Sequence, residues 1–235
     1  MEMISCQQLK KVYGEGENQV IALNNVTLSV EKGEFIAVLG PSGSGKSTLL
    51  HMLAGVDKPD SGKVFIAGTD LSQLNQDKLA IFRRRHVGLV YQFFNLMPVL
   101  TAEENITLPH LLDGRKLDKA RLDEVLHYLG LENRRSHLPS ELSGGQQQRV
   151  SIGRALYSRP DILLCDEPTG NLDRKATQDI MLLLKEANRT LKQTVMMITH
   201  DESLALQADR LIYIEDGKIM RDERIRHQMR NQKEK

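Results

Sequence analysis

A glycine-rich loop between an apolar run and a helical pattern constrains this chain more than any other feature. The apolar run at 35–39 predicts a buried strand, and the pattern at 49–54 predicts a helix. Between them stands the loop Gly40-Pro41-Ser42-Gly43-Ser44-Gly45-Lys46-Ser47-Thr48. Strand, glycine loop and helix N-terminus in this order are typical of a phosphate-binding loop in an α/β fold. The alternative, an ordinary flexible Gly/Ser turn, does not account for the two flanks.

The residue types in the loop suit a nucleoside triphosphate. Gly40, Gly43 and Gly45 let the backbone turn without a Cβ, so that successive N–H groups converge on one anion. Lys46 adds a cation for the β- and γ-phosphates, and the Ser47 hydroxyl suits Mg²⁺. The sequence therefore predicts that the chain binds a nucleoside triphosphate.

Length and composition limit the class of protein. The 235 residues are 40% hydrophobic and 27% charged, which suits one large α/β domain or one domain with an inserted lobe. A formal net charge of +1 does not favour nucleic acid as a partner. Cys6 and Cys165 lack metal-ligand spacing and form no disulfide framework, which favours a reducing compartment. With no signal-peptide pattern and no run near the ~20 apolar residues of a membrane span, we expect a soluble cytoplasmic protein.

The order of the remaining patterns predicts a mixed α/β core with an insertion. Strands are expected at 4–12, 20–30, 63–67, 87–91, 162–165 and 195–198, followed by a hairpin of 211–214 against 218–220. Helices are expected near 75–84, from 101, from 118 to 130, from 143 to before 160, at 175–189 and at 202–207. The helical block 93–159 predicts an inserted lobe within one domain whose core is 1–92 and 160–235. The basic run 83–85 suits a helix C-terminus, with a nucleic-acid patch as the alternative. The charged tail from Arg221 is expected to be solvated, with membrane-surface contact as the alternative.

Two acidic residues follow the strand predicted at 162–165. Asp166 and Glu167 stand at the carboxyl end of that strand, where ligands bind in open α/β sheets. Asp166, facing the glycine loop, would hold Mg²⁺ against the phosphates. Glu167 would orient and deprotonate the attacking water. Alone such a pair also begins an ordinary turn, but beside the glycine loop we favour the functional interpretation.

A second glycine motif, Leu142-Ser143-Gly144-Gly145-Gln146, precedes another predicted helix. It places a hydroxyl and two bare amides at a helix N-terminus, which forms an anion site, although simple helix capping uses the same residues. The chain thus offers two phosphate-binding devices about a hundred residues apart. A single nucleotide bound to one copy of the fold hardly needs both of these phosphate-binding devices.

On these motifs the sequence resembles the nucleotide-binding subunits of ABC transporters over nearly its whole length. Residues 40–48 resemble the Walker A loop of that family, 142–146 its signature motif, and 162–167 its Walker B strand with the catalytic glutamate. Cys165 is a departure at a position that often holds another small or apolar residue. The resemblance implies a P-loop NTPase of the ABC ATPase fold, with a mixed β core, an antiparallel β subdomain and an inserted α-helical lobe.

The resemblance also implies a head-to-tail dimer with two ATP molecules in the shared interface. It adds Gln92 as the Q-loop residue, Asp173 in the D-loop 171–173, His200 as the switch histidine and Tyr13 as the ring that stacks on adenine. Catalytic roles then fall to Glu167, His200, Lys46 and Gln92, and Mg²⁺ ligands would be Ser47, Gln92 and Asp166. ATP would contact Tyr13, Gly40, Pro41, Ser42, Gly43, Ser44, Gly45, Lys46, Ser47 and Thr48 of one copy and Ser143, Gly144, Gly145, Gln146 and Asp173 at the interface.

A separate membrane permease is the expected partner, which would place the chain on the cytoplasmic face of the membrane. The segment 93–100 is apolar, interrupted by Pro98 and poor in helix signals, so it can form a groove with Gln92 for a permease helix or pack within the lobe. Segments 91–93, 96–98 and 101–105 resemble the branch that serves lipoprotein release and macrolide or antimicrobial-peptide export. Amino-acid importers share part of this pattern, and a cell-division regulator would carry similar motifs. A two-cassette ABC ATPase is disfavoured by the single cassette, and a GTPase or small-molecule kinase by the signature motif.

Overall fold

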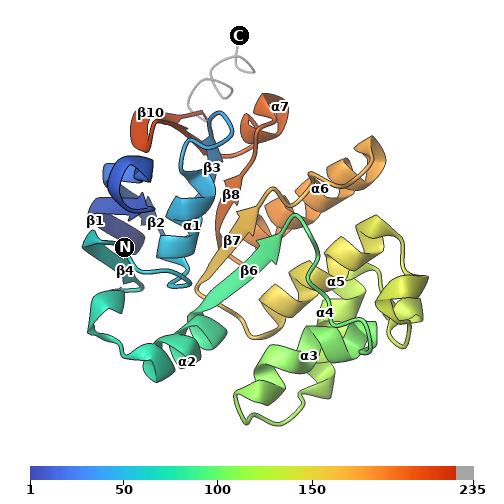
Figure 1. The fold of residues 1–235 in the computed structure, drawn as a ribbon. Helices are drawn as coiled ribbons and strands as arrows, with labels where there is room; N and C mark the ends of the chain where they lie inside the picture. Colours follow the sequence, from blue (N-terminus) through green and yellow to red (C-terminus); the bar gives the residue numbers. More distant parts are fainter. Residues whose placement is uncertain (226–235) are drawn as a thin grey trace.

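A six-stranded sheet forms the centre of the computed structural model, which describes residues 1–225 apart from the side chain of Glu17 (Figure 1). The strand order is β10-β9-β3-β8-β7-β6. The parallel strands are β3 (Phe35–Leu39), β6 (Val87–Tyr91), β7 (Ile162–Asp166), β8 (Thr194–Ile198) and β9 (Arg210–Glu215), and β10 (Lys218–Arg224) pairs antiparallel with β9. The central parallel strands are continuous apolar runs because both faces of this sheet are covered.

A second, four-stranded sheet is antiparallel and has the order β2-β1-β4-β5. Its strands are β1 (Glu2–Tyr13), β2 (Val20–Glu31), β4 (Ser61–Ile66) and β5 (Thr69–Asp70). In Figure 1 this sheet lies on the same side of the central strands as α1 (Lys46–Leu53). The two sheets together confirm the predicted mixed core and antiparallel subdomain.

The other helices occupy the positions that their sequence signals predict. They are α2 (Gln76–His86), α3 (Ala102–Leu112), α4 (Lys119–Leu129), α5 (Gly144–Tyr157), α6 (Arg174–Thr190) and α7 (Glu202–Ala205), with 3-10 turns at 16–18, 71–73, 132–134 and 139–141. Thr101 and Glu104 form the predicted capping box of α3. Asp118 caps α4, which ends at Gly130 with a φ of 63°. No helix within residues 1–225 is long and apolar enough to cross a membrane.

Two hydrophobic cores cover the two faces of the central sheet. Alternation along β3 sends Ile36 and Val38 to a core shared with the antiparallel sheet, α1 and α2. Phe35 and Ala37 point to the opposite core, which contains the buried residues of α3, α4, α5 and α6. The inserted helices therefore share one core with a face of the sheet, and this packing fixes the start of α5 relative to the strands.

The basic end of α2 joins this helix to the inserted helices. Arg84 donates to the Leu112 carbonyl at the end of α3, and Arg85 donates to the carboxylate of Asp113 at 2.8 Å. Arg115 makes an ion pair with the same carboxylate at 2.8 Å. Asp113 is nearly buried, with 5% of its side chain exposed, so three guanidinium groups surround one carboxylate.

The C-terminal part of the chain differs from the prediction in one respect. β10 extends to Arg224, so residues 221–224 pair with β9 although their side chains are exposed. The prediction of a solvated tail from Arg221 missed this pairing because 221–224 lack an apolar face. The last ten residues of the tail lie outside the described residues.

Candidate active site

The glycine loop turns between β3 and α1 in a conformation that only glycine fits. Gly45 has a φ of 101° and Gly40 a φ of 156°. A Cβ on Gly45 would clash with the carbonyl oxygen of Ala22, and one on Gly40 with that of Ile214. The neighbouring strands therefore approach the loop backbone so closely that only glycine fits at these two positions.

The hairpin between β9 and β10 braces the same loop. Asp216 and Gly217 have φ values of 46° and 70°, as the predicted type I′ turn requires. The Gly217 N–H donates to the carbonyl oxygen of Ser44 at 3.0 Å, and the Asn24 N–H donates to the Gly217 carbonyl at 2.8 Å. The sequence predicted this turn but not its contact with the phosphate-binding loop. A local turn signal carries no information about a partner so far away along the chain.

The side chain of Lys46 folds back over the first residues of the glycine loop. Its Nζ donates to the carbonyl oxygens of Gly40 at 2.9 Å and Pro41 at 2.7 Å, and the residue is buried. Burial lowers the pKa of the Lys46 ammonium, while the charges of Glu167 and Asp166 oppose that shift. The cation is thus placed between the loop and the two acidic residues.

The hydroxyl of Ser47 and the carboxylate of Asp166 meet at the end of β7. Ser47 Oγ donates to Asp166 Oδ1 at 3.1 Å, although the two residues are far apart in the sequence. A hydroxyl and a carboxylate are oxygen donors of the kind that Mg²⁺ takes beside phosphates. Two of the three predicted metal ligands, Ser47 and Asp166, are therefore close enough to hold one ion between them.

Glu167 and His200 are also in contact. Nδ1 of His200 lies 2.9 Å from Oε1 and 3.0 Å from Oε2 of the carboxylate. Glu167 has a φ of 47°, which is uncommon outside glycine, and its N–H donates to the Ile198 carbonyl of β8 at 3.0 Å. Its carboxylate is the second acidic group at the carboxyl end of β7, beside Asp166.

Gln92 lies one residue beyond β6 and faces the D-loop. Its Nε2 donates to Oδ1 of Asn171 at 3.2 Å, and the Asn171 amide donates back to the Gln92 carbonyl at 3.1 Å. Among residues 1–225 we find no hydrogen bond from this side chain to Ser47 or Asp166. The structure thus brings Gln92 to the D-loop, and its role as a metal ligand stays a prediction.

Tyr13 stands at the end of β1, near the other end of the glycine loop. Its hydroxyl donates to Oδ2 of Asp57 at 2.9 Å, and Nζ of Lys11 lies 5.2 Å from the centre of the ring. Burial raises the pKa of the Tyr13 hydroxyl, and Asp57 adds to that shift. With 42% of the residue exposed, the ring remains accessible to a base. The sequence did not predict Asp57 as the partner of this hydroxyl.

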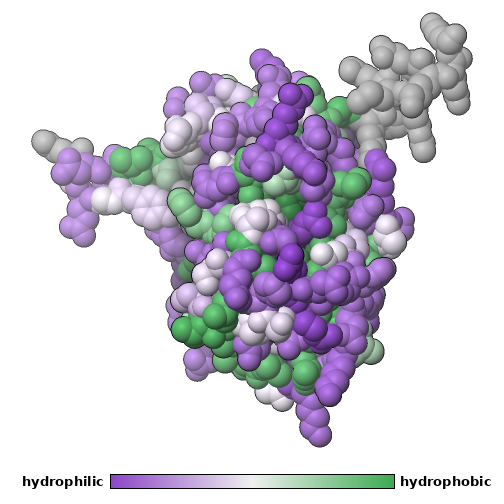
Figure 2. Space-filling view, turned by 90° about the vertical axis from the view of Figure 1, so that its right-hand side faces the viewer, coloured by the Kyte–Doolittle hydropathy of each residue, from purple (hydrophilic) through white to green (hydrophobic). Residues whose placement is uncertain are grey.

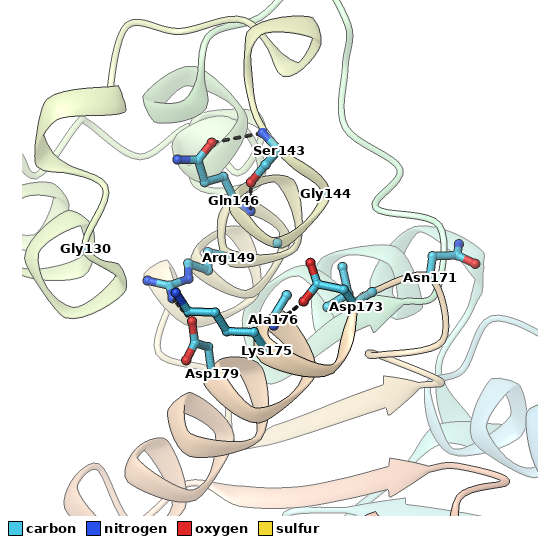
Figure 3. A pocket seen from close by; sticks show the side chains of 12 residues that line it. Gly130, Ser143, Gly144, Gln146, Arg149, Asn171, Asp173, Lys175, Ala176 and Asp179 are labelled. Atoms are coloured by element: carbon cyan, nitrogen blue, oxygen red, sulfur yellow. Dashed lines mark hydrogen bonds and ion pairs between the residues drawn. The ribbon is translucent and has the colours of Figure 1, made fainter.

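The signature motif forms a separate cavity of about 400 Å³ (Figure 3). Ser143 caps α5: its N–H donates to Oε1 of Gln146 at 2.9 Å, and its hydroxyl accepts from the Gln146 N–H at 3.3 Å. Asp173 caps α6 across the cavity and accepts from the Ala176 N–H at 2.8 Å. The walls comprise Gly130, Ser143, Gly144, Gly145, Gln146, Arg149, Asn171, Leu172, Asp173, Lys175, Ala176 and Asp179.

The predicted residues therefore fall into two groups. Lys46, Ser47, Asp166, Glu167 and His200 converge at the glycine loop, while the signature residues and Asp173 share the separate cavity. No residue of 40–48 lines that cavity in the described chain. The described chain thus holds the two predicted phosphate-binding motifs apart from each other, and the helix-capping alternative alone does not account for the cavity.

Comparisons with known proteins agree with this geometry. The family model for ABC transporters matches residues 23–170. An uncharacterized ABC transporter ATP-binding protein of Methanocaldococcus jannaschii is 45% identical over 231 residues, which are 95% of this chain and 98% of that protein. The lipoprotein-releasing system ATP-binding protein LolD of Idiomarina loihiensis is 40% identical over 223 residues, which are 94% of this chain and 98% of that protein.

A longer relative and a solved structure extend the comparison. The macrolide export ATP-binding/permease protein MacB of Mannheimia succiniciproducens is 41% identical over 233 residues, 98% of this chain but 36% of that protein. A solved dimeric ATP-binding cassette in a post-hydrolysis state, bound to ADP and Pi, is 43% identical, with a TM-score of 0.87. The match covers 95% of this chain and 99% of that one. This agreement confirms the predicted fold class.

Proposed function

The chain belongs to the ABC transporter family, and from this premise we propose that two copies close head to tail over two ATP molecules and drive a separate membrane permease. The chain is an ATP-hydrolysing subunit: relatives over nearly its whole length are ATP-binding subunits, and a dimeric cassette of this fold was solved with ADP and Pi. The separation of the glycine loop from the signature cavity carries the dimer proposal, because a two-fold axis brings each half-site to the other copy's ligand.

Within one half-site, the glycine loop 40–48 would bind the triphosphate through its backbone N–H groups and Lys46. Ser47 and Asp166, with Gln92, would hold Mg²⁺, which offsets charge on the β- and γ-phosphates when it is bound. Tyr13 would stack on adenine, since its ring is exposed and its hydroxyl is held by Asp57. From the other copy, Ser143, Gly144, Gly145, Gln146 and Asp173 would face the γ-phosphate.

The proposed hydrolysis uses the contact between Glu167 and His200 at the end of β7. Glu167 would accept a proton from the attacking water, and His200 would contact the γ-phosphate while it orients the carboxylate. Lys46 would offset the charge that develops on the phosphate oxygens. Loss of the γ-phosphate removes the contacts with the other copy, so hydrolysis would open the dimer.

The face shown in Figure 2, on the side that lies to the right in Figure 1, is mainly hydrophilic, with hydrophobic residues in small groups. Among the described residues, this face shows no single large apolar patch of the kind that marks a permanent interface. We keep residues 1–235 as one nucleotide-binding domain, with a core of 1–92 and 160–235 and a lobe of 93–159. The shared core between the inserted helices and the central sheet supports a single domain.

The permease would dock beside the segment 93–100. Phe93, Met97 and Val99 are 70%, 46% and 76% exposed, so three large apolar side chains are exposed within seven residues of the chain. A neighbouring hollow of about 380 Å³ is lined by Tyr91, Arg83 and Pro109 among other residues. Exposed apolar side chains beside a hollow suit an amphipathic helix of a membrane partner.

The cargo proposed is a lipoprotein, a macrolide or an antimicrobial peptide. This choice rests on the LolD and MacB relatives together with the motifs at 91–105. MacB carries an ATP-binding and a permease part in one protein, as its name says, and this chain corresponds to about a third of its length. Bound to the permease, the chain would lie on the cytoplasmic face of the membrane.

Site-specific cross-linking in cells tests the permease assignment. A photoreactive residue at Phe93 or Val99 should cross-link to an integral membrane protein, whereas the same residue at Leu182 on α6, which is 57% exposed, should not. The control is an exposed apolar position on a helix outside the segment 93–100. Cross-linking of all three positions to the same proteins, or of none to a membrane protein, would contradict the docking site.

A further inference from the structure

Gln148 is a polar side chain buried in the middle of the helix that begins with the signature motif. It lies on α5, and none of its surface is exposed. Val150 and Ile152, close by on the same helix, are fully buried members of the hydrophobic core. A side-chain amide in such surroundings is unfavourable unless its polar atoms are hydrogen-bonded. The position therefore needs an explanation beyond packing.

The amide nitrogen of Gln148 explains the choice of residue. Nε2 donates to the carbonyl oxygen of Tyr91 at 3.2 Å and to that of Pro168 at 2.6 Å. Oε1 is buried and has no hydrogen-bond partner within the described chain. An apolar side chain of similar length would avoid the penalty of that unpaired oxygen. The glutamine is thus accounted for by its two donor contacts.

The two carbonyl groups belong to the loops that carry the proposed hydrolytic residues. Tyr91 is the last residue of β6, and its carbonyl forms the peptide bond to Gln92. Pro168 directly follows Glu167 at the end of β7. β6 and β7 are neighbours in the sheet, with Tyr91 opposite Asp166. One buried amide therefore bridges the carboxyl ends of two adjacent strands.

The backbone at Glu167 depends on such ties. Its φ of 47° is a conformation that a residue with a side chain adopts at a cost, so the surrounding structure must hold it. On one side its N–H donates to Ile198, and on the other its carbonyl accepts from the Gly170 N–H, both at 3.0 Å. The bond from Gln148 to Pro168 is the tie that joins this turn to α5.

We propose that Gln148 is a positioning residue for ATP hydrolysis, which fixes the loops of Gln92 and Glu167 relative to each other and to the signature helix. The inference rests on the proposed roles of Gln92 and Glu167. Its two acceptors lie outside the glycine loop 40–48, which would bind the phosphates, so we expect the affinity for ATP to be kept. A loss of positioning slows the chemical step while the affinity for ATP is kept.

Steady-state ATP hydrolysis and ATP binding by Gln148→Met test the proposal. Methionine has similar length but no donor, and we expect kcat to fall roughly ten- to a hundredfold while the Kd for ATP changes by less than about twofold. Gln193→Met is the matched control, because Gln193 is also a buried glutamine and its amide donates to the Pro160 carbonyl at 3.1 Å, before the start of β7 and away from both half-sites. The control should keep the kcat of the unmodified protein.

A second experiment separates a positioning role of Gln148 from a general loss of structure. In the Gln92→Ala background, Gln148→Met should lower kcat by a smaller factor than it does alone, because part of what it positions is already gone. Unchanged kcat for Gln148→Met overturns the proposal. Equal factors in the two backgrounds, or a fall in kcat that matches a loss of folded protein in thermal unfolding, also overturn it.

If Gln148→Met does not fold, Gln148→Glu takes its place. A protonated carboxyl group donates one hydrogen bond and a carboxylate none, so kcat relative to the unmodified protein should rise as the pH falls. A ratio that does not change with pH would overturn the proposal. Glu167→Gln distinguishes the catalytic role of Glu167 from the positioning role of Gln148. Full activity of Glu167→Gln would refute the catalytic role of Glu167. An inactive Glu167→Gln together with a fully active Gln148→Met would refute only the role of Gln148.

Discussion

The imidazole of His200 lies against the carboxylate of Glu167, with Nδ1 2.9 and 3.0 Å from its two oxygens. The two residues come from the ends of the neighbouring strands β7 and β8. Their contact places the proposed general base and its proposed orienting partner where ligands bind in an open α/β sheet. The proposed mechanism of ATP hydrolysis depends on the contact between Glu167 and His200.

Replacing His200 should slow hydrolysis without preventing ATP binding. We expect His200→Ala to lower kcat by roughly 10²-fold, within the range for groups that take part in acid–base steps, with little change in ATP affinity. His127→Ala is the control, since His127 makes a similar pair with Glu132 at 2.7 Å on the surface of α4. A stopped-flow or coupled ATPase assay measures both. Equal rates for the two variants would exclude the role of His200.

The hairpin contact predicts that a glycine far from the loop affects ATP binding. Gly217→Ala introduces a Cβ 2.9 Å from the Ala22 carbonyl at a φ of 70°, so we expect a stability loss of about 1–3 kcal/mol and a several-fold weaker ATP affinity. Gly114→Ala has a φ of 72° but open space around its Cβ, so it should lose stability alone. Isothermal titration calorimetry measures the ATP affinity of both variants. Equal affinities would refute the role of Gly217 in bracing the glycine loop.

Acid should remove the contribution of Asp113 to stability. The hydrogen bond from Arg85 is the largest influence that holds the pKa of Asp113 below its usual range, and the charges of Arg115 and Arg84 add to it. A lowered folded-state pKa stabilises the protein above the unfolded value of about 3.9, and this stability is lost as the pH falls through the folded value. Asp113→Asn should therefore cost about 2 kcal/mol near pH 7.

Urea unfolding of both proteins across a pH series measures this difference. The gap between the unmodified protein and Asp113→Asn should narrow below about pH 4 and vanish once Asp113 is protonated in the folded state. Glu132→Gln, at an exposed pair with His127, should change stability far less than Asp113→Asn at neutral pH. A gap for Asp113→Asn that stays constant with pH would contradict the electrostatic explanation.

Much of the fold follows from local patterns. Val87–Tyr91 forms the strand that its apolar run predicts, and the turn at Asp216-Gly217 forms because both residues tolerate a positive φ. The capping boxes at Thr101 and Ser143 begin helices as predicted. These features are encoded within a few residues of each other, so the sequence alone is enough to place them.

The contacts that join the elements were not predictable in the same way. Gln148 stands in a stretch of three glutamines, and nothing in its neighbours distinguishes it from Gln147, which lies at the edge of the signature motif. Only the packing of α5 against β6 and β7 shows that Gln148 bridges two loops. The pairing of Gly217 with Ser44 likewise depends on tertiary contacts between distant segments.

The molar mass in solution tests whether two half-sites on separate copies enclose each nucleotide. Glu167→Gln should be monomeric alone and dimeric with ATP, because bound ATP is no longer removed by hydrolysis. Ser143→Asp in that background keeps a good cap for α5 but sets a negative charge against the γ-phosphate, so this protein should bind ATP and remain monomeric. Light scattering with chromatography reports both. A Glu167→Gln protein that stays monomeric at saturating ATP, or one that dimerises equally well with Ser143→Asp, would contradict the proposed ATP-dependent dimer.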